Sequence, residues 1–309
     1  MQQLLIDTDP GVDDAYALLM ALSHAQAQVV AITVTAGNVG LAHTVRNALR
    51  VIDTVGQAIP VHAGCLSPFL APPPGAGFVH GDDGFGDAGL PQPKSRVSAG
   101  HAVDAMLDLS RRRPGELTFV CLGPLTNLAT ALMLDPRLPE RVPRLVIMGG
   151  AVNGRGNTER LNAEFNIGFD PEAADIVFRH WPQFELVDWE ATLAHGVPFD
   201  TLEQWLAQDT ANARLLQAIS AKRHAWVRAH RSASHSHLAD ALAMAVVLEP
   251  ALVREALERP LSVSLAGAHT RGMTVVDWLQ RGGQPANARI VQRVDQAGFE
   301  ALIERTLRA

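Results

Sequence analysis

The chain has 309 residues, of which 47% are apolar and 19% charged, a composition typical of a globular protein. Its net charge of −6 and the absence of any basic run argue against nucleic acid or an anionic membrane surface as a partner. A small molecule, neutral or held through a bound cation, fits this charge better. The two cysteines, Cys65 and Cys121, are too few for a disulfide framework or a zinc cage of their own.

The sequence carries no visible targeting or membrane-spanning segment. The N-terminus lacks a basic region followed by a long apolar one, and no apolar stretch approaches the roughly 20 residues that span a bilayer. We therefore expect a cytoplasmic protein that contacts no membrane. Because neither an internal repeat nor a clean linker is visible, we also expect a single domain over residues 1–309.

Strand and helix patterns alternate through the first half of the chain. Apolar and β-branched runs predict strands over residues 3–6, 29–35, 117–121 and 145–148. Helical patterns fall over residues 12–25, 41–55, 98–110 and 125–134. This alternation is typical of an α/β fold with a mostly parallel central sheet flanked by helices. In such sheets ligands bind beyond the carboxyl ends of the strands, so polar side chains at these points are candidate site residues.

Two segments depart from this alternation. Residues 67–93 are rich in proline and glycine and include His80, which suits either an active-site lid or a disordered insert. Residues 201–236 look helical and carry Trp226 and His230. The chain after residue 262 reads as a short strand-rich tail with a final helix.

Four aspartates crowd one turn near the N-terminus. Asp7, Asp9, Asp13 and Asp14 lie between the strand at residues 3–6 and the helix that follows. Their mutual repulsion disfavours ionisation, and a hard cation with oxygen ligands relieves it. Capping of the helix N-terminus explains one of these acids but not four. The turn therefore predicts a metal site.

Polar side chains also follow the later strands. Asn38 ends the Thr-Ala-Gly-Asn string after the second strand, where an ordinary turn asparagine is the alternative. Met148 precedes two glycines, and Asn157 lies further along this loop. In an extended segment Glu164 and Asn166 would project to the same side, which suits a sugar diol; a solvent-facing loop is the alternative.

Asp240 opens a helix that is otherwise almost wholly apolar. A carboxylate leading a buried helix needs a partner, because burying it alone is costly. Capping of the helix would satisfy it, but together with the N-terminal acids a third metal carboxylate is the better interpretation.

Together these strings resemble the inosine-uridine preferring nucleoside hydrolase family. The most specific of them is Asp-Thr-Asp-Pro-Gly-Val-Asp-Asp at residues 7–14. The companions occur in the family's order: Asn38 and its string, Gly-Pro-Leu-Thr-Asn at residues 123–127, Met148-Gly-Gly, Glu164-Phe-Asn166 and the helix opened by Asp240. The resemblance covers about residues 3–250.

The resemblance implies a Rossmann-like nucleoside hydrolase architecture and Ca²⁺-dependent hydrolysis of the N-glycosidic bond of ribonucleosides, to ribose and free base. It also implies a homodimer or homotetramer. Asp9, Asp14, Asp240 and the backbone carbonyl of Leu122 match the family's Ca²⁺ ligands. Asp9 also matches the general base for the water that the cation holds.

Ribose contacts are implied at a wider set: Asp13, Asn38, Met148, Asn157, Glu164, Asn166 and Asp240. The spacing from Asn157 to Glu164 is one residue longer here than the family's pattern. Such a site suits an oxocarbenium-like transition state, because carboxylates and amides near the reacting carbon stabilise positive charge.

The chain departs from the family just before Asp240. One subgroup carries a histidine there as the acid for the leaving base, whereas this chain has Ala239. Candidate replacements, since imidazole titrates near neutral pH, are His237 first and then His235, His230 and His80. Another subgroup stacks the purine between aromatic side chains, for which Trp226 or Phe85 are candidates. The nucleobase preference is not readable from these residues.

Two other functions stay open at this point. A non-catalytic nucleoside- or sugar-binding protein would keep the calcium pocket and tolerate the missing histidine. A phosphatase of the haloacid dehalogenase type would use Asp7 and Asp9 as nucleophile and acid. That family needs a lysine earlier than the acidic element at residues 82–87, yet the only lysines, Lys94 and Lys222, come after it.

Overall fold

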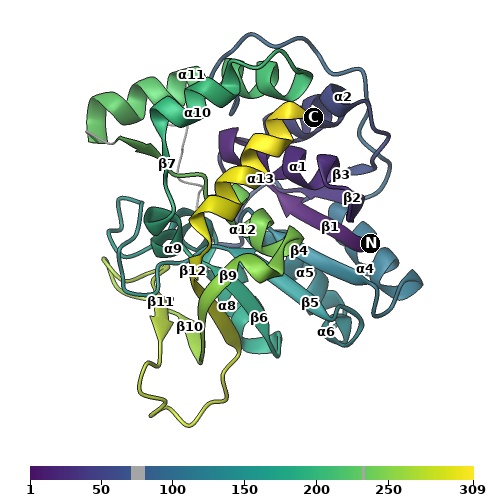
Figure 1. The fold of residues 1–309 in the computed structure, drawn as a ribbon. Helices are drawn as coiled ribbons and strands as arrows, with labels where there is room; N and C mark the ends of the chain where they lie inside the picture. The colour runs from purple at the N-terminus through teal and green to yellow at the C-terminus, as the bar shows by residue number, and fades with distance from the viewer. Residues whose placement is uncertain (71–80, 232–233) are drawn as a thin grey trace.

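An eight-stranded sheet forms the centre of the computed structural model, which describes residues 1–70, 81–231 and 234–309, with the side chains at 226 and 229–231 outside that description (Figure 1). Its strand order is β3-β2-β1-β4-β5-β6-β12-β9, and all neighbours run parallel except β12 and β9. The strands are β1 (Gln2–Thr8), β2 (Ala27–Val34), β3 (Val61–Ala63), β4 (Leu117–Cys121), β5 (Arg144–Met148), β6 (Phe184–Val187), β9 (Val253–Arg259) and β12 (Ala288–Val294).

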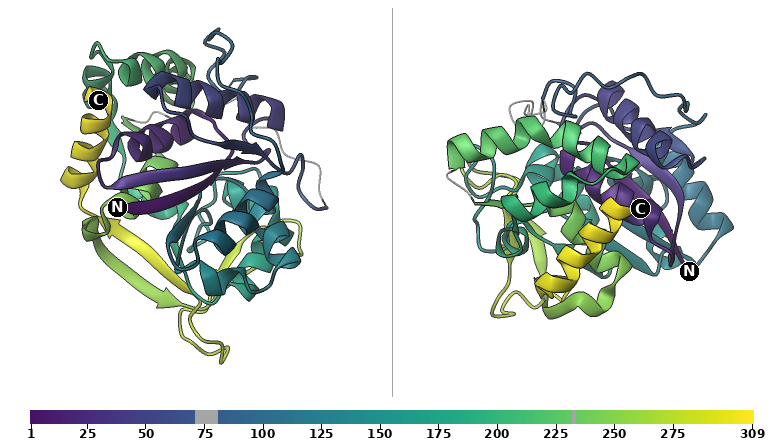
Figure 2. Two further views of the ribbon diagram at one scale, coloured as in Figure 1. Left: turned by 90° about the vertical axis from the view of Figure 1, so that its right-hand side faces the viewer. Right: turned by 45° about the horizontal axis from the view of Figure 1, so that its top comes forward.

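Helices cover both faces of this sheet (Figures 1 and 2). One face packs against α1 (Val12–Ser23), α2 (Leu41–Val55) and α12 (Ala239–Leu248). Helices α11 (Ala211–Arg231) and α13 (Gln296–Arg308) pack on the outer side of α1. The other face packs against α4 (Ala102–Arg112), α5 (Thr126–Leu134), α6 (Leu138–Arg141) and α8 (Pro171–His180). Successive strand residues alternate between the two cores, with Leu4 and Ile6 in the first and Leu5 in the second.

The predicted α/β fold with a mostly parallel sheet is confirmed, and the elements lie close to their predicted positions. Strand β4 and helix α2 have the predicted bounds, and Gly56 ends α2 in the left-handed conformation at φ 66°. Helix α4 begins at Ala102 rather than at residue 98, because His101 caps it by accepting a hydrogen bond from the Val103 N–H.

Residues 201–236 are not one helical segment. Helix α10 (Phe199–Leu206) and helix α11 are separated by a turn, and β8 (His235–Ser236) then pairs with β7 (Val197–Pro198). The helical prediction is wrong for these last residues because their backbone pairs across to a distant strand.

The expected strand-rich tail and final helix are confirmed, but the tail does more than was predicted. Strands β10 (Leu261–Val263) and β11 (Thr274–Val276) form a small antiparallel arm, whereas β12 enters the central sheet between β6 and β9. Among the helices of the described residues, none is both long and apolar enough to cross a membrane.

Candidate active site

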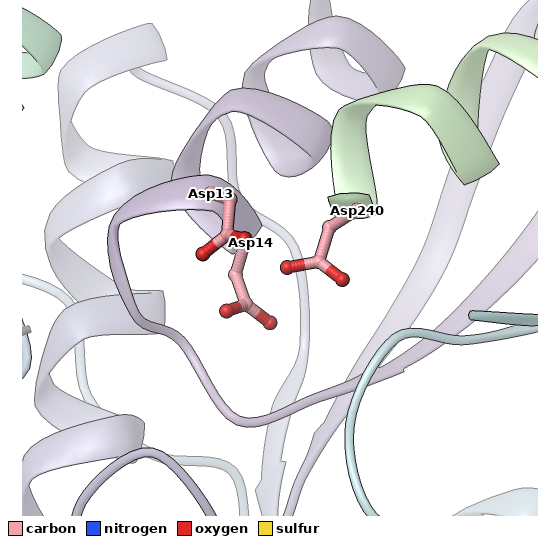
Figure 3. Close-up of side chains that lie close together, drawn as sticks. All are labelled: Asp13, Asp14 and Asp240. Atoms are coloured by element: carbon pink, nitrogen blue, oxygen red, sulfur yellow. The ribbon is translucent and has the colours of Figure 1, made fainter. Parts of the chain in front are cut away.

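The N-terminal turn and the start of α12 bring three carboxylates together at the carboxyl edge of the sheet. Oxygen atoms of Asp13, Asp14 and Asp240 all lie within 4.8 Å of one another (Figure 3). Asp14 and Asp240 are buried, while Asp13 is partly exposed. Helix α12 packs along α1, which is why residues so far apart in the sequence meet here.

Asp9 joins this cluster and is held on three sides. The Asn38 N–H donates to Asp9 Oδ2 at 2.7 Å. A Cβ at Gly37 would lie 2.0 Å from Asp9 Oδ2, and one at Gly123 would lie 2.4 Å from Asp9 Oδ1. Only glycines at both positions leave room for the carboxylate, so its orientation is fixed by backbone on either side.

Asn38 links Asp9 to Asp14. Its side-chain amide donates to the Asp9 carbonyl and to Asp14 Oδ2, both at 3.1 Å. Asp14 also accepts hydrogen bonds from the Thr8 hydroxyl and from the Gly11 N–H, the latter at 2.9 Å. These donors stabilise one carboxylate at the N-terminus of α1 and leave the cluster as a whole short of positive charge.

The local electrostatics favour a bound cation. Burial and then repulsion from Asp14 and Asp13 raise the pKa of Asp9 well above its usual range. Burial, followed by repulsion from these same acids, raises the pKa of Asp240 in the same way. The donor set consists of oxygen atoms alone, which suits a hard divalent cation rather than zinc or copper. These oxygen atoms therefore fit a metal site, but they do not identify the ion.

A second group of predicted residues lies beside Asp9. The side-chain amide of Asn166 donates to the Leu122 carbonyl at 2.7 Å and to the Met148 carbonyl at 3.2 Å. Leu122 precedes Gly123, which contacts Asp9, so the two groups form one continuous site. A carbonyl oxygen has two lone pairs, and the bond from Asn166 leaves the Leu122 oxygen able to hold a cation.

Glu164 and Asn166 do not lie on an extended segment, and that prediction is wrong. Helix α7 (Phe165–Phe169) begins between them, and Glu164 caps it by accepting from the N–H groups of Asn166 and Ile167. Glu164 also accepts from the Gly150 N–H at 2.9 Å. Glu164 itself is extended as the cap, but Phe165 and Asn166 are helical, so the side chains do not alternate as on a strand. Burial raises the pKa of Glu164 to about 7.

Asn157 lies half-buried in the loop between β5 and α7. Its backbone N–H donates to the Ala163 carbonyl at 3.2 Å, and its side-chain oxygen is buried. Among the described residues, no hydrogen bond joins the Asn157 side chain to the acidic cluster.

His237 lies between β8 and α12, outside regular structure. Its ring packs 6.3 Å from that of Trp189, centroid to centroid, and a Cβ on Gly196 would lie 3.0 Å from His237 Nε2. Arg223 donates to its backbone carbonyl at 2.5 Å. His235 is exposed and hydrogen-bonded to Ser234.

The remaining base-pocket candidates fare differently. Phe85 is fully buried in the core beside α1, so its proposed stacking on a purine is wrong. His80 and residues 71–80 of the predicted lid lie outside the described residues, as do the side chains of Trp226 and His230.

Sequence reasoning missed the residues that hold Asp7. Its fully buried carboxylate accepts from the Thr33 hydroxyl at 2.7 Å and from the Asn127 amide at 2.9 Å. Burial raises the pKa of Asp7 to about 7. A group so enclosed cannot act as a phosphatase nucleophile. Asn127 ends the Gly-Pro-Leu-Thr-Asn string, which was the available signal.

Comparison with known proteins agrees with this geometry. Residues 4–301 match the sequence family described as inosine-uridine preferring nucleoside hydrolase. The chain is 34% identical to a protein of that name from Crithidia fasciculata, over 98% of this chain and 96% of that one. It is 36% identical to the non-specific ribonucleoside hydrolase RihC of Salmonella paratyphi B, over 96% and 94% of the two chains. An inosine-guanosine nucleoside hydrolase of known structure superposes with a TM-score of 0.92 at 29% identity, over 99% and 98%. The chain therefore belongs to the inosine-uridine preferring nucleoside hydrolase family and is an N-glycosyl hydrolase that acts on nucleosides.

Proposed function

We propose that the protein hydrolyses the N-glycosidic bond of ribonucleosides to ribose and free base, and that it requires Ca²⁺. The observation that carries the proposal is the close group of Asp13, Asp14 and Asp240, to which Asn38 ties Asp9. The pKa values of Asp9, Asp14 and Asp240 are all raised.

Asp9, Asp14, Asp240 and the Leu122 carbonyl are the proposed Ca²⁺ ligands. They supply carboxylate and carbonyl oxygens, which Ca²⁺ prefers, and they come from separate segments that pack together. When bound, the cation supplies coordination for the ribose diol and lowers the pKa of a water.

Asp9 is the proposed general base. Its position between Gly37 and Gly123 fixes the direction of both carboxylate oxygens, and the Asn38 N–H occupies only Oδ2. Oδ1 is therefore the oxygen we assign to proton removal from the attacking water.

The other predicted residues are assigned to the ribose. Asp13, Asn38 and Asn166 border the proposed ligands, with Met148 and Glu164 directly behind Asn166. Asp240 and Asn157 complete the proposed set. A site built around hydroxyl groups rejects a substrate that lacks one by roughly 10⁴–10⁵-fold, so we expect 2′-deoxynucleosides to be poor substrates.

His237 is the proposed acid for the leaving base, with His80, Trp226 and His230 proposed to border that base. The three named relatives differ in the nucleosides that their names specify, and we propose no single base. We also propose that the protein is cytoplasmic and forms a homodimer or homotetramer. Light scattering on the purified protein tests the oligomeric state.

The test is ribose release from a panel of ribonucleosides, with and without a calcium chelator. Release that is lost on chelation and restored by Ca²⁺ supports the proposal and ranks the bases. Release that survives complete removal of metal would exclude the calcium requirement. Saturable nucleoside binding without ribose release would instead support a non-catalytic binding protein.

A further inference from the structure

Asn47 on α2 joins two segments through one side-chain amide. It is fully buried, and its Nδ2 donates to the Pro10 carbonyl at 3.1 Å and to the Asp83 carbonyl at 2.8 Å. Pro10 follows Asp9 in the acidic turn. Asp83 belongs to residues 81–91, the glycine-rich segment that returns toward α2. One amide therefore uses both of its hydrogens to hold these two backbones together.

Arg50, one turn along α2, fixes the orientation of that amide. Its Nη1 donates to Asn47 Oδ1 at 3.1 Å. A flip of the Asn47 amide would break this hydrogen bond and the two that Nδ2 donates. Its Nη2 donates to the Leu90 carbonyl at 2.9 Å and its Nε to the Pro91 carbonyl at 3.1 Å. Asn47 and Arg50 thus hold residues 81–91 at both ends, at Asp83 and at Leu90 and Pro91.

The Pro10 carbonyl that Asn47 holds belongs to the same peptide group as the Gly11 N–H. That N–H donates to Asp14 Oδ2 at 2.9 Å. Because a peptide group is planar and rigid, fixing its oxygen also fixes the direction of its N–H. The position of the Asp14 carboxylate is therefore tied, through one peptide plane and one amide, to the backbone at Asp83.

Close packing surrounds this connection. A Cβ at Gly84 would lie 3.0 Å from Asn47 Nδ2 and 3.3 Å from the Pro10 oxygen. Phe85 is buried in the core next to it. The buried Pro10 carbonyl needs a donor, and Asn47 supplies one to it and to the partly buried Asp83 carbonyl.

We propose that Asn47 is a positioning residue that couples cation binding at the acidic turn to the placement of residues 81–91, with Arg50 setting its orientation. In this proposal Asn47 acts through the Pro10–Gly11 peptide and Asp14, with no direct contact with the cation or the substrate. The inference rests on the proposed function, because it takes Asp14 to be a cation ligand.

The variant Asn47→Ala tests this coupling, with Asn212→Ala as the matched control. Asn212 is also buried and donates to the Thr306 carbonyl at 2.9 Å and to the Ser23 hydroxyl, away from the acidic turn. Calorimetry with Ca²⁺ should show binding weakened by roughly 10- to 100-fold in Asn47→Ala, as for other groups that orient metal ligands. Asn212→Ala should lose thermal stability and keep its Ca²⁺ affinity.

Amide hydrogen exchange provides a second measurement, on the wild-type protein. Ca²⁺ should slow exchange in residues 81–91, and Asn47→Ala should remove that effect. Asn47→Asp, which keeps the volume and the contact with Arg50 but removes both donors, carries the same expectations if Asn47→Ala does not fold.

If the wild type binds Ca²⁺ and an Asn47 variant binds it with an affinity within about twofold of the wild type, this inference is overturned while the proposed function stands. Groups that orient metal ligands normally change the affinity by more than that. Unchanged exchange of residues 81–91 on Ca²⁺ binding to the wild type would overturn it too. A wild-type protein that binds no Ca²⁺ would overturn the proposed function, and the inference with it.

Discussion

A methyl group at Gly123 would lie 2.4 Å from Asp9 Oδ1, a separation that real side chains do not tolerate. We expect Gly123→Ala to push the Asp9 carboxylate out of place and to lower kcat by about 10²-fold, since displacement by an ångström costs that much. Ribose release under saturating nucleoside measures it. Gly40→Ala is the control, because a Cβ there meets nothing within 4 Å. Equal activity of both variants would contradict the proposed role of Asp9.

His237 offers a prediction that separates acid catalysis from structure. If it protonates the leaving base, His237→Ala should slow nucleosides by roughly 10²–10⁴-fold. The same variant should hydrolyse p-nitrophenyl riboside nearly normally, because that leaving group needs no proton. His269→Ala, at an exposed position between β10 and β11, is the control. Equal slowing of both substrates would remove His237 from this role.

Much of the acidic cluster could be predicted from the sequence because three of its aspartates lie in one short motif. Asp9, Asp13 and Asp14 are neighbours in sequence, so their crowding is visible before folding. Glu164 was misjudged because extended backbone was assumed where a helix cap forms. Asn47 left no signal at all, since a buried asparagine in a helix gains its meaning from the carbonyls that tertiary packing brings to it.

At the scale of elements, α11 and α10 are joined by a buried histidine. The rings of His224 and Phe199 pack in a T-shaped pair, with centroids 5.1 Å apart. Burial, then the charges of Arg223 and Arg228, lower the pKa of His224 to about 4. Between the unfolded pKa of 6.5 and this value only the unfolded chain takes up the proton, so stability is lost as pH falls through that window.

The wild type should therefore lose about 2 kcal/mol more than His224→Leu between pH 7 and pH 5. Urea denaturation of both proteins at the two pH values measures the difference. Stability curves that run parallel would mean that His224 titrates normally in the folded chain.

The elements that the sequence did not reveal share a physical cause. Strand β6 has four residues, too few for a clear pattern, and β12 carries two arginines and a glutamine among its apolar residues, as an edge strand would. Its place inside the sheet depends on pairing with β6 and β9, where Arg289 meets Glu185. In contrast, β1, β2 and β4 are apolar runs that alternate with helices, and this pattern can be predicted from the local sequence.

At the scale of the whole molecule, the acidic cluster joins the N-terminal turn to α12, which begins at Ala239, more than 200 residues later in the sequence. In the absence of a cation, burial raises the pKa of Asp240 and Asp14, so ionising them above the ordinary carboxylate value destabilises the folded chain as pH rises. A cation bound by these carboxylates displaces their protons and removes that cost.

We therefore expect Ca²⁺ to raise the Tm, and to raise it more at pH 8 than at pH 5, where protons compete for the same oxygens. At 100 times the Kd, binding contributes about 2.7 kcal/mol, which corresponds to a shift of several degrees. Thermal scans with chelator and with Ca²⁺ measure the shift. Asp240→Asn should abolish most of it, because the variant keeps the side-chain volume and loses the charge. A shift of equal size in Asp240→Asn would mean that Ca²⁺ stabilises the fold from another position, since a cation bound in this cluster cannot hold α12 to α1 without that carboxylate.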